Sequence, residues 1–208
     1  MLLARMIRIF GLAHLVLGAL AATLLLTEPS TRRYGDNLQI ILPVLAWGCA
    51  ATSGNGRDFA LRFASMFTVA HASKSLLGDM ELNQRPSGGG HGFPSAHTGA
   101  AALGASSLVH DCLKGSAGAQ AVVVLAAGFV GASRIEVGAH DIWQVTAGAI
   151  LGWAADRALR RDSRARRGVV ALLGWAGTLL WRVRCSAAQV AVLFVAGLAK
   201  LRSARIVP

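Results

Sequence analysis

The 208-residue chain has few charged residues, and most of its charges have one sign. Only 15% of the residues are Asp, Glu, Lys or Arg, and 10 acidic residues face 21 basic ones. Hydrophobic residues make up 54% of the chain, and its mean hydropathy is +0.51. This leaves too little polar surface for a soluble domain of this size. The scarcity of charge therefore predicts a protein that lies in a lipid bilayer.

Cysteines, acidic clusters and aromatic residues are also scarce, and each scarcity excludes a class of protein. Cys49, Cys112 and Cys185 are odd in number and lie in or beside apolar segments. We interpret them as small packing residues, with neither a disulfide framework nor a metal site. No acidic cluster is placed to hold a metal. The net charge of +11 comes without an aromatic-basic platform, which argues against nucleic acid as a partner.

Apolar stretches predict an all-α fold, a polytopic membrane bundle of six helices. The stretches lie at about 9–26, 38–53, 59–73, 95–110, 118–133 and 142–156. A crossing usually needs ~20 residues, so the shorter stretches are expected to lengthen through the motif residues at their ends. Residues 1–167 are predicted to form this six-helix core. Residues 168–208 are expected to be an appendage of two short apolar helices, either lying at the membrane interface or forming an additional hairpin.

Positive charge predicts how this bundle is oriented. Arginines precede the first stretch, lie around the second connection and form a run at 157–167, and by parity all of these fall on one side. Basic residues favour the cytoplasmic side, so both ends of the core are expected there. Arg32 and Arg33 fall on the other side and are the exception. The excess positive charge is also suited to anionic lipid headgroups.

Three separated clusters carry residues suited to chemistry. They are Lys74 with Arg85-Pro86, then Pro94-Ser95-Ala96-His97, then Ser133-Arg134 followed by His140. Cations can clamp a phosphoryl group while one histidine attacks the phosphorus and another protonates the leaving oxygen. Parity places all three clusters at the extracytoplasmic face, where they can meet. The clusters therefore predict phosphoryl transfer that uses no metal and no cofactor.

In order and spacing, the clusters resemble the type 2 phosphatidic acid phosphatase family of integral membrane lipid phosphatases. The family pattern is K-x6-RP, then PSGH, then SR-x5-H-x3-D, and the match runs from Lys74 to Gln144. The resemblance implies that His140 is the nucleophile and that His97 is the acid for the leaving group. It also implies a phosphate-binding set of Lys74, Arg85, Ser95, Ala96 and Arg134.

The chain departs from the family pattern at three positions. Ten residues separate Lys74 from Arg85 instead of six, so Lys74 could instead be an ordinary interfacial lysine. Ala96 replaces a glycine, which adds a methyl group where the backbone approaches the ligand. Gln144 replaces an aspartate; its amide oxygen can orient His140 but stabilises a developing imidazolium less. Glutamine at this position also resembles the glucose-6-phosphatase branch of the superfamily.

Three neighbouring residues could assist the site. Glu136 or Asp141 could supply the charge that Gln144 lacks, although solvated loop carboxylates would look the same in the sequence. His91, in the glycine-rich segment 87–93, could contact the substrate or support the site.

Together these features predict a phosphatase of a bacterial inner membrane, with its active site facing the periplasm. It would hydrolyse a lipid phosphomonoester or pyrophosphate through a phosphohistidine, with the lipid phosphate and membrane lipids as partners and no obligate protein partner. The alternatives are a phosphotransferase that passes the group between lipids at the same site, and a non-catalytic scaffold or transporter with a degenerate site. The family resemblance implies four candidate lipids: phosphatidic acid, phosphatidylglycerol phosphate, an isoprenyl diphosphate and the phosphates of a lipid A-like glycolipid.

Overall fold

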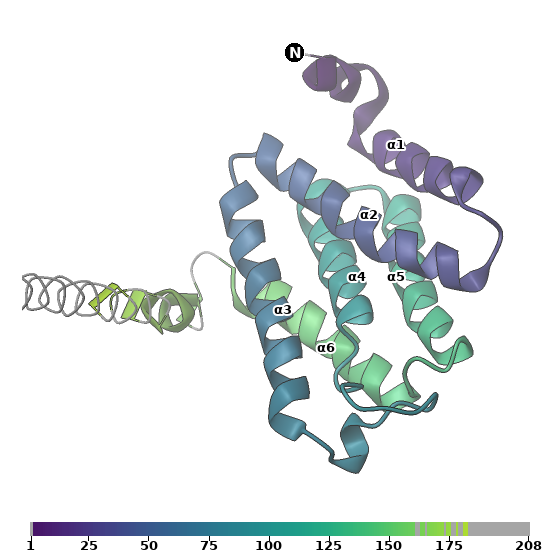
Figure 1. The fold of residues 1–208 in the computed structure, drawn as a ribbon. Coiled ribbons are helices and arrows are strands. Elements are labelled where there is room, and N and C mark those ends of the chain that lie inside the picture. The colour runs from purple at the N-terminus through teal and green to yellow at the C-terminus, as the bar shows by residue number, and fades with distance from the viewer. Residues whose placement is uncertain are drawn as a thin grey trace, which may run out of the picture. The chain divides into compact units, whose positions relative to one another are not determined.

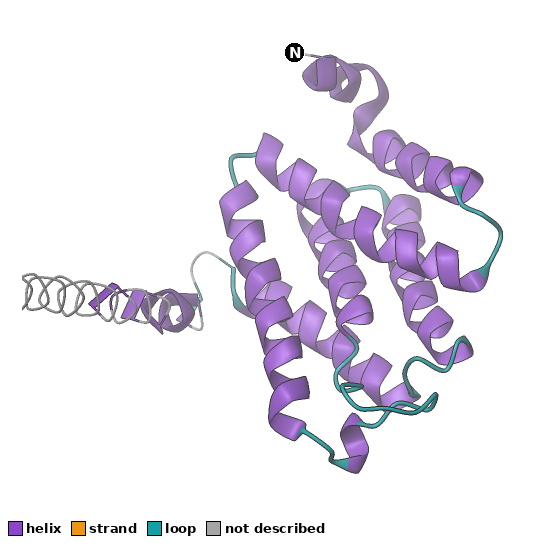
Figure 2. Cartoon of the chain, viewed as in Figure 1, coloured by secondary structure: helices purple, strands orange, loops and turns teal. Residues whose placement is uncertain are grey.

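The computed structural model describes residues 2–160 and, beyond them, 163–164, 166–172, 174–175, 178 and 181–182. Helices and loops make up these residues, with no strand among them (Figure 2). The chain divides into two compact units, residues 1–161 and 162–208. In the second unit most of the described residues are helical. The apolar run at 187–199, predicted as the second appendage helix, lies outside the described residues, as does Cys185.

The first unit consists of α-helices that coincide with the six predicted apolar stretches (Figure 1). They are α1 (Leu2–Leu26), α2 (Thr31–Thr52), α3 (Gly56–Leu77), α4 (Ala96–Ser107), α5 (Ala117–Glu136) and α6 (Ile142–Ala158). A short 3-10 turn, η1 (Glu81–Asn83), follows α3, and a π-helical segment, η2 (Leu108–Cys112), extends α4. The all-helical prediction is therefore confirmed for the described residues.

The prediction of six membrane-spanning helices is not confirmed by helix composition. Within the part of the chain that the structure describes, α5 alone is both long enough and apolar enough to cross a membrane by itself. Helices α2 and α3 have 22 residues each but carry charged residues, while α4 has 12 residues and α6 has 17. Six spans remain a prediction.

Helix α4 forms the centre of the bundle. It packs against α2, α5 and α6, and all of its residues except His97 and Ala102 are buried. Small residues let α4 and α6 come close. On α6, a Cβ atom at Gly148 would collide with the carbonyl of Ser95, which directly precedes α4. The backbone N–H of Ser95 also donates to the carbonyl of Gln144 at 2.9 Å. The starts of α4 and α6 are thereby fixed side by side.

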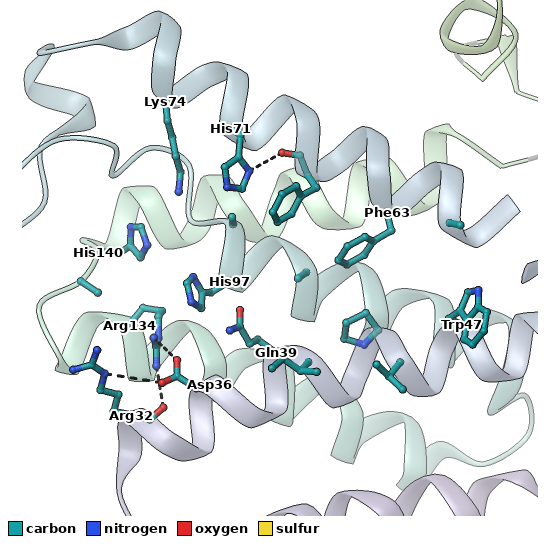
Figure 3. A pocket seen from close by; sticks show the side chains of 18 of the residues that line it. Arg32, Asp36, Gln39, Trp47, Phe63, His71, Lys74, His97, Arg134 and His140 are labelled. Carbon is teal, nitrogen blue, oxygen red and sulfur yellow. Dashed lines mark hydrogen bonds and ion pairs between the residues drawn. The ribbon is translucent and has the colours of Figure 1, made fainter. Parts of the chain in front are cut away.

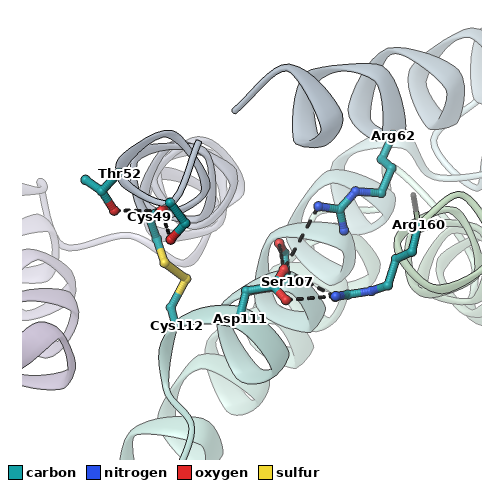
Figure 4. Close-up of a disulfide and its surroundings, with 8 residues drawn as sticks. Cys49, Thr52, Arg62, Ser107, Asp111, Cys112 and Arg160 are labelled. Atoms are coloured by element: carbon teal, nitrogen blue, oxygen red, sulfur yellow. Dashed lines mark hydrogen bonds and ion pairs between the residues drawn. A yellow bond between two sulfur atoms is a disulfide. The ribbon is translucent and has the colours of Figure 1, made fainter. Parts of the chain in front are cut away.

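A cluster of charges, of which Arg62 and Asp156 are buried, joins α3, η2 and α6 at the opposite end of the bundle. The guanidinium of Arg62, which is only 2% exposed, pairs with the buried carboxylate of Asp156. Arg160 reaches Asp111 at 2.8 Å and Asp156 at 3.1 Å, and Figure 4 shows Arg62 and Arg160 converging on the region of Asp111. Breaking a buried pair leaves an uncompensated charge, so this cluster holds three elements in one arrangement.

A disulfide bond joins Cys49, near the end of α2, to Cys112, at the end of η2 (Figure 4). The interpretation of these two cysteines as unpaired packing residues is therefore wrong. Their Cα atoms are 6.2 Å apart, within the range that a disulfide can bridge. The cysteines are separated by 63 residues, so only the packing of α2 against the α4–η2 segment brings them together.

Candidate active site

The predicted site residues meet around a cavity at one end of the bundle. The starts of α2, α4 and α6 and the ends of α3 and α5 lie at this end (Figure 1). The cavity has a volume of about 820 Å³ and is bordered by α2, α3 and α4. The motif clusters contribute Lys74, Arg85, Ala96, His97, Arg134 and His140 to its walls. All three clusters therefore face one space.

His140 lies between α5 and α6 and is oriented by Gln144 in the first turn of α6. Its Nδ1 is 3.0 Å from Gln144 Oε1. The amide nitrogen of Gln144 donates to the carbonyls of Leu82 and Gln84, at 3.1 and 2.7 Å, which determines which end of the amide faces the histidine. An amide oxygen can only accept, so His140 carries its proton on Nδ1. Its Nε2 is left with a lone pair for an electrophile.

Burial and neighbouring cations keep His140 neutral. Burial lowers the pKa of the ring, and the charges of Lys74 and Arg85 lower it further, while the hydrogen bond with Gln144 raises it in part. The net direction is downward. Near pH 7 the ring is therefore in the neutral form, which is the form that can act as a nucleophile.

Arg134 is buried at the end of α5 and is fixed by three hydrogen bonds. Its Nε donates to Ser133 Oγ at 3.2 Å, one terminal nitrogen to Asp36 at 2.9 Å, and the other to the carbonyl of Arg32 at 3.1 Å. A guanidinium has five N–H groups, so two remain for an anion in the cavity. Close approach of α2 allows this contact, because a Cβ atom on Gly35 would collide with Ser133.

The unusual spacing between Lys74 and Arg85 does not remove Lys74 from the site. Lys74 is buried in the last turn of α3 and points into the cavity (Figure 3). The additional residues form η1, where Asn83 donates to the carbonyls of Lys74 and Gly78 at 2.9 and 2.7 Å. Asn83 Oδ1 accepts from the N–H of Phe93 at 3.0 Å, so one buried amide holds the two ends of the loop together.

Arg85 is carried by this loop. Its guanidinium donates to the carbonyl of His91 at 3.3 Å, while its buried Nε has no hydrogen-bond partner among the described residues. The N–H of Ser87 donates to the carbonyl of Gly138 at 3.0 Å. The loops that carry Arg85 and His140 are therefore joined directly.

His97 lies in the first turn of α4 and points into the cavity near Arg134 (Figure 3). Ala96 also lines the cavity, whereas Ser95 is fully buried and is not among the lining residues. The hydroxyl of Ser95 caps α4, accepting from the N–H and the hydroxyl of Thr98 at 3.4 and 3.0 Å. The structure thus gives Ser95 a capping role, and phosphate binding by its side chain remains only a prediction.

Within the described chain, none of the three possible supporting side chains hydrogen-bonds to His140. Asp141 caps α6 by accepting from the N–H of Gln144 at 2.8 Å, and Glu136 accepts from the hydroxyl of Thr31 at 3.1 Å. His91 is exposed, and its side chain does not line the cavity. Among the described residues, no group of three or more His, Cys, Asp or Glu side chains is arranged to hold a metal ion.

Apart from Lys74, the α2 and α3 residues that line the cavity were not identified from the sequence. Asp36 and Gln39 from α2, and His71 from α3, face the same space as the histidines of the motif (Figure 3). Farther along the two helices, away from the cations, the cavity walls are apolar. They consist of Ile40, Pro43, Val44 and Trp47 on α2 and Phe59, Phe63 and Phe67 on α3. The three-to-four-residue spacing of both sets was a signal available in the sequence.

The family model of the PAP2 superfamily matches residues 13–167. The chain belongs to the PAP2 superfamily. This membership, which covers α2 to α6 and the whole of the candidate site, indicates phosphatase activity. No curated protein matches the chain. No solved structure matches it either.

Proposed function

We propose that the protein is a membrane phosphatase that hydrolyses a lipid phosphate through a phosphohistidine on His140, without a metal. One observation carries the proposal: the Gln144 amide oxygen accepts from Nδ1 of His140, which leaves the lone pair on Nε2 of a ring that lines the cavity. Cations from three elements surround that cavity, namely Lys74, Arg85 and Arg134. These can neutralise the charge on the transferring phosphoryl group, which is the role that metal ions have in other phosphoryl-transfer enzymes.

The reaction proceeds in two steps. In the first, Nε2 of His140 attacks the phosphorus and the bond from phosphorus to the lipid oxygen breaks, while His97, which takes up a proton when the anionic phosphate binds beside it, gives that proton to the lipid oxygen. In the second, neutral His97 takes a proton from water as the water oxygen attacks the phosphorus, and the bond from phosphorus to nitrogen breaks. Inorganic phosphate leaves, and both histidines return to their starting states.

The apolar part of the cavity supports a lipid as the substrate. Phe59, Phe63, Phe67 and His71 lie four residues apart on α3, with neighbouring ring centroids 4.0 to 6.4 Å apart. On the facing side, Ile40 is 58% exposed and Trp47 51% exposed, so this wall is not covered by other parts of the described chain. A groove that leads from cations to exposed aromatic and aliphatic residues suits a phosphate headgroup with an apolar tail.

Exposed apolar residues also support placement in a membrane. Leu125, Trp143, Ile150 and Trp153 each expose more than half of their surface on α5 and α6. Large exposed apolar surfaces mark contact with lipid or a partner. We place the cavity at the extracytoplasmic face because the arginines at 157–167 follow α6, whose start lies at the cavity end.

The decisive experiment is to trap the phosphorylated enzyme and compare two histidine variants. Purified protein in detergent is given a lipid phosphate and an activated aryl phosphate, then quenched in alkali, which preserves phosphohistidine. We expect His140→Ala to abolish phosphate release and labelling with both substrates. We expect His97→Ala to lose the lipid reaction but to retain part of the aryl reaction, whose leaving group needs no proton.

Wild-type turnover by His140→Ala would disprove the nucleophile assignment. No turnover of any substrate by the wild type would favour a scaffold or transporter, and transfer to an added lipid alcohol would favour a phosphotransferase. Activity that EDTA abolishes and a divalent ion restores would contradict the metal-independent mechanism.

A further inference from the structure

A polar tier lies in the cavity between the phosphate-binding cations and the apolar groove. Gln39 on α2 and His71 on α3 both line the cavity, and in Figure 3 they point into it from opposite helices. On α2, Gln39 follows Asp36, the partner of Arg134, by three residues. On α3, His71 precedes Lys74 by three residues. At a rise of ~1.5 Å per residue, the polar tier is about 4.5 Å deeper than the phosphate-binding tier.

The hydrogen-bonding capacity of this tier is only partly used within the described residues. The side-chain amide of Gln39 makes no hydrogen bond there, and the residue is half-buried. Nδ1 of His71 is 2.9 Å from the carbonyl of Phe67, which can only accept, so this nitrogen carries the proton. In the neutral ring, Nε2 is then an acceptor, and because His71 is exposed it can accept from a ligand in the cavity.

We infer that Gln39 and His71 form a subsite for the polar backbone of the lipid, directly below its phosphate. This inference rests on the proposed function. The amide of Gln39 can donate to a carbonyl, and His71 Nε2 can accept from a hydroxyl or an amide N–H. The subsite therefore fits a lipid phosphate that carries a hydroxyl or amide N–H next to a carbonyl, as a monoacylglycerol phosphate or an N-acylated amino-alcohol phosphate does.

This chemistry distinguishes between classes of lipid phosphate. An isoprenyl phosphate has no hydrogen-bonding group beyond its phosphate, so it would pair with neither Gln39 nor His71. A site built to hydrogen-bond a ligand disfavours an analogue that lacks the group, because its own polar atoms then remain unpaired. Diacylglycerol phosphate supplies acceptors only, and would satisfy Gln39 but not His71.

The test uses matched substrates and matched variants of the full-length protein in mixed micelles. The substrates are 1-oleoylglycerol 3-phosphate, its analogue without the 2-hydroxyl group, farnesyl phosphate and 4-nitrophenyl phosphate. For the wild type we expect kcat/KM to fall about 3- to 10-fold when the hydroxyl is removed, as for one hydrogen bond. This comparison requires no mutation and does not depend on the folding of any variant.

Gln39→Leu and His71→Phe keep the size of each side chain and remove its polar atoms. We expect each to lower kcat/KM for the hydroxylated lipid about 3- to 10-fold and to raise it for farnesyl phosphate, because no polar atom is then left unpaired beside the apolar chain. Ser73→Ala, on α3 but outside the cavity lining, is the control and should change none of the four rates.

Two results would overturn the subsite while the phosphatase assignment stands. One is that Gln39→Leu and His71→Phe lose activity equally on all substrates, and the other is that the wild type does not distinguish the hydroxylated lipid from its analogue. Hydrolysis of none of the four compounds by the wild type would overturn both.

Discussion

At the scale of single residues, the candidate nucleophile depends on an uncharged partner. Gln144 accepts from His140 and also donates to two loop carbonyls, so one fully buried side chain both orients the ring and holds the loop after α3. An aspartate could do the first task but not the second, since it has no N–H to donate. With glutamine at this position, the site lacks a negative charge to stabilise an imidazolium on His140. In return, the amide N–H groups anchor the loop after α3.

We expect Gln144→Asp to retain activity and to shift its pH dependence. The pKa of His140 is lowered in the folded protein, and activity is lost as the pH falls through that pKa and the ring becomes protonated. A carboxylate beside the ring raises its pKa, so the acidic limb of the kcat/KM profile should move to higher pH. Profiles for 4-nitrophenyl phosphate measure this shift, and a limb that moved to lower pH would contradict it.

The same substitution should reduce stability. The carbonyls of Leu82 and Gln84 would lose their donor, and leaving a buried group unsatisfied costs about 1–3 kcal/mol. The thermal unfolding midpoint in detergent should therefore fall. An unchanged midpoint would show that water replaces the Gln144 amide.

Asp36 is expected to act as a positioning residue for Arg134. Its carboxylate accepts from Arg134 at 2.9 Å and is partly exposed. Because hydrogen bonds to charged groups contribute about 1.5–3 kcal/mol, Asp36→Ala should lower kcat/KM about 10- to 100-fold. Asp36→Asn keeps an acceptor and should retain most activity and bind vanadate at least as tightly as the wild type. If both variants lose activity equally, the carboxylate charge itself is required, contrary to this prediction.

At the scale of elements, the close contact of α4 with α6 positions the two histidines. Gly148 and Gly152 face the backbone of Ser95 and Gly99, and this contact sets the start of α4 beside the start of α6. His97 lies in the first turn of α4 and His140 precedes α6, so the distance between the two histidines depends on these two glycines. Small residues are the usual means of such approach between helices in lipid.

We expect Gly148→Ala to destabilise the protein by about 1–3 kcal/mol, the range for overpacking a tight contact. Gly128→Ala on α5 is a matched control, because a Cβ atom there meets nothing within 4 Å and alanine favours a helix. Unfolding midpoints followed by tryptophan fluorescence compare the two variants. Equal midpoints for Gly148→Ala and wild type would show that α4 and α6 can separate without loss of stability.

At the scale of the whole molecule, two features disagree about orientation. The arginine run after α6 predicts that the end opposite the cavity faces the cytoplasm, yet the disulfide between Cys49 and Cys112 lies at that end. Disulfides are rare in the reducing cytoplasm. We give priority to the arginines, because basic residues set orientation during insertion whereas a disulfide forms after folding.

Cysteine labelling in intact cells decides the orientation. Ser87 is exposed in the loop at the cavity end, and Asn55 is exposed in the turn between α2 and α3 at the other end. In a Cys185→Ser background, we expect Ser87→Cys to react with an impermeant thiol reagent and Asn55→Cys to react only after lysis. The reverse pattern would place the cavity in the cytoplasm and the disulfide outside, which would agree with the disulfide and not with the arginines.

The sequence by itself determined the helical elements and the chemistry of the site. Long apolar stretches predicted α1 to α6, because hydrophobic runs and helix propensity are local properties. The motif clusters identified Lys74, Arg85, His97, Arg134 and His140, which the structure brings to one cavity. The pairing of Gln144 with His140 also followed from sequence, since the family pattern has a partner for the histidine four residues after it.

Only the tertiary structure decided which distant residues support that site. Asp36 and Arg134 are 98 residues apart, Gln144 lies 60 residues beyond Gln84, and Cys49 lies 63 residues before its partner. The groove containing Gln39 and His71 exists because α2 and α3 both border the same cavity. Such contacts depend on how whole helices pack, through glycines such as Gly35 and Gly148, and the spacing of residues along the chain does not encode them.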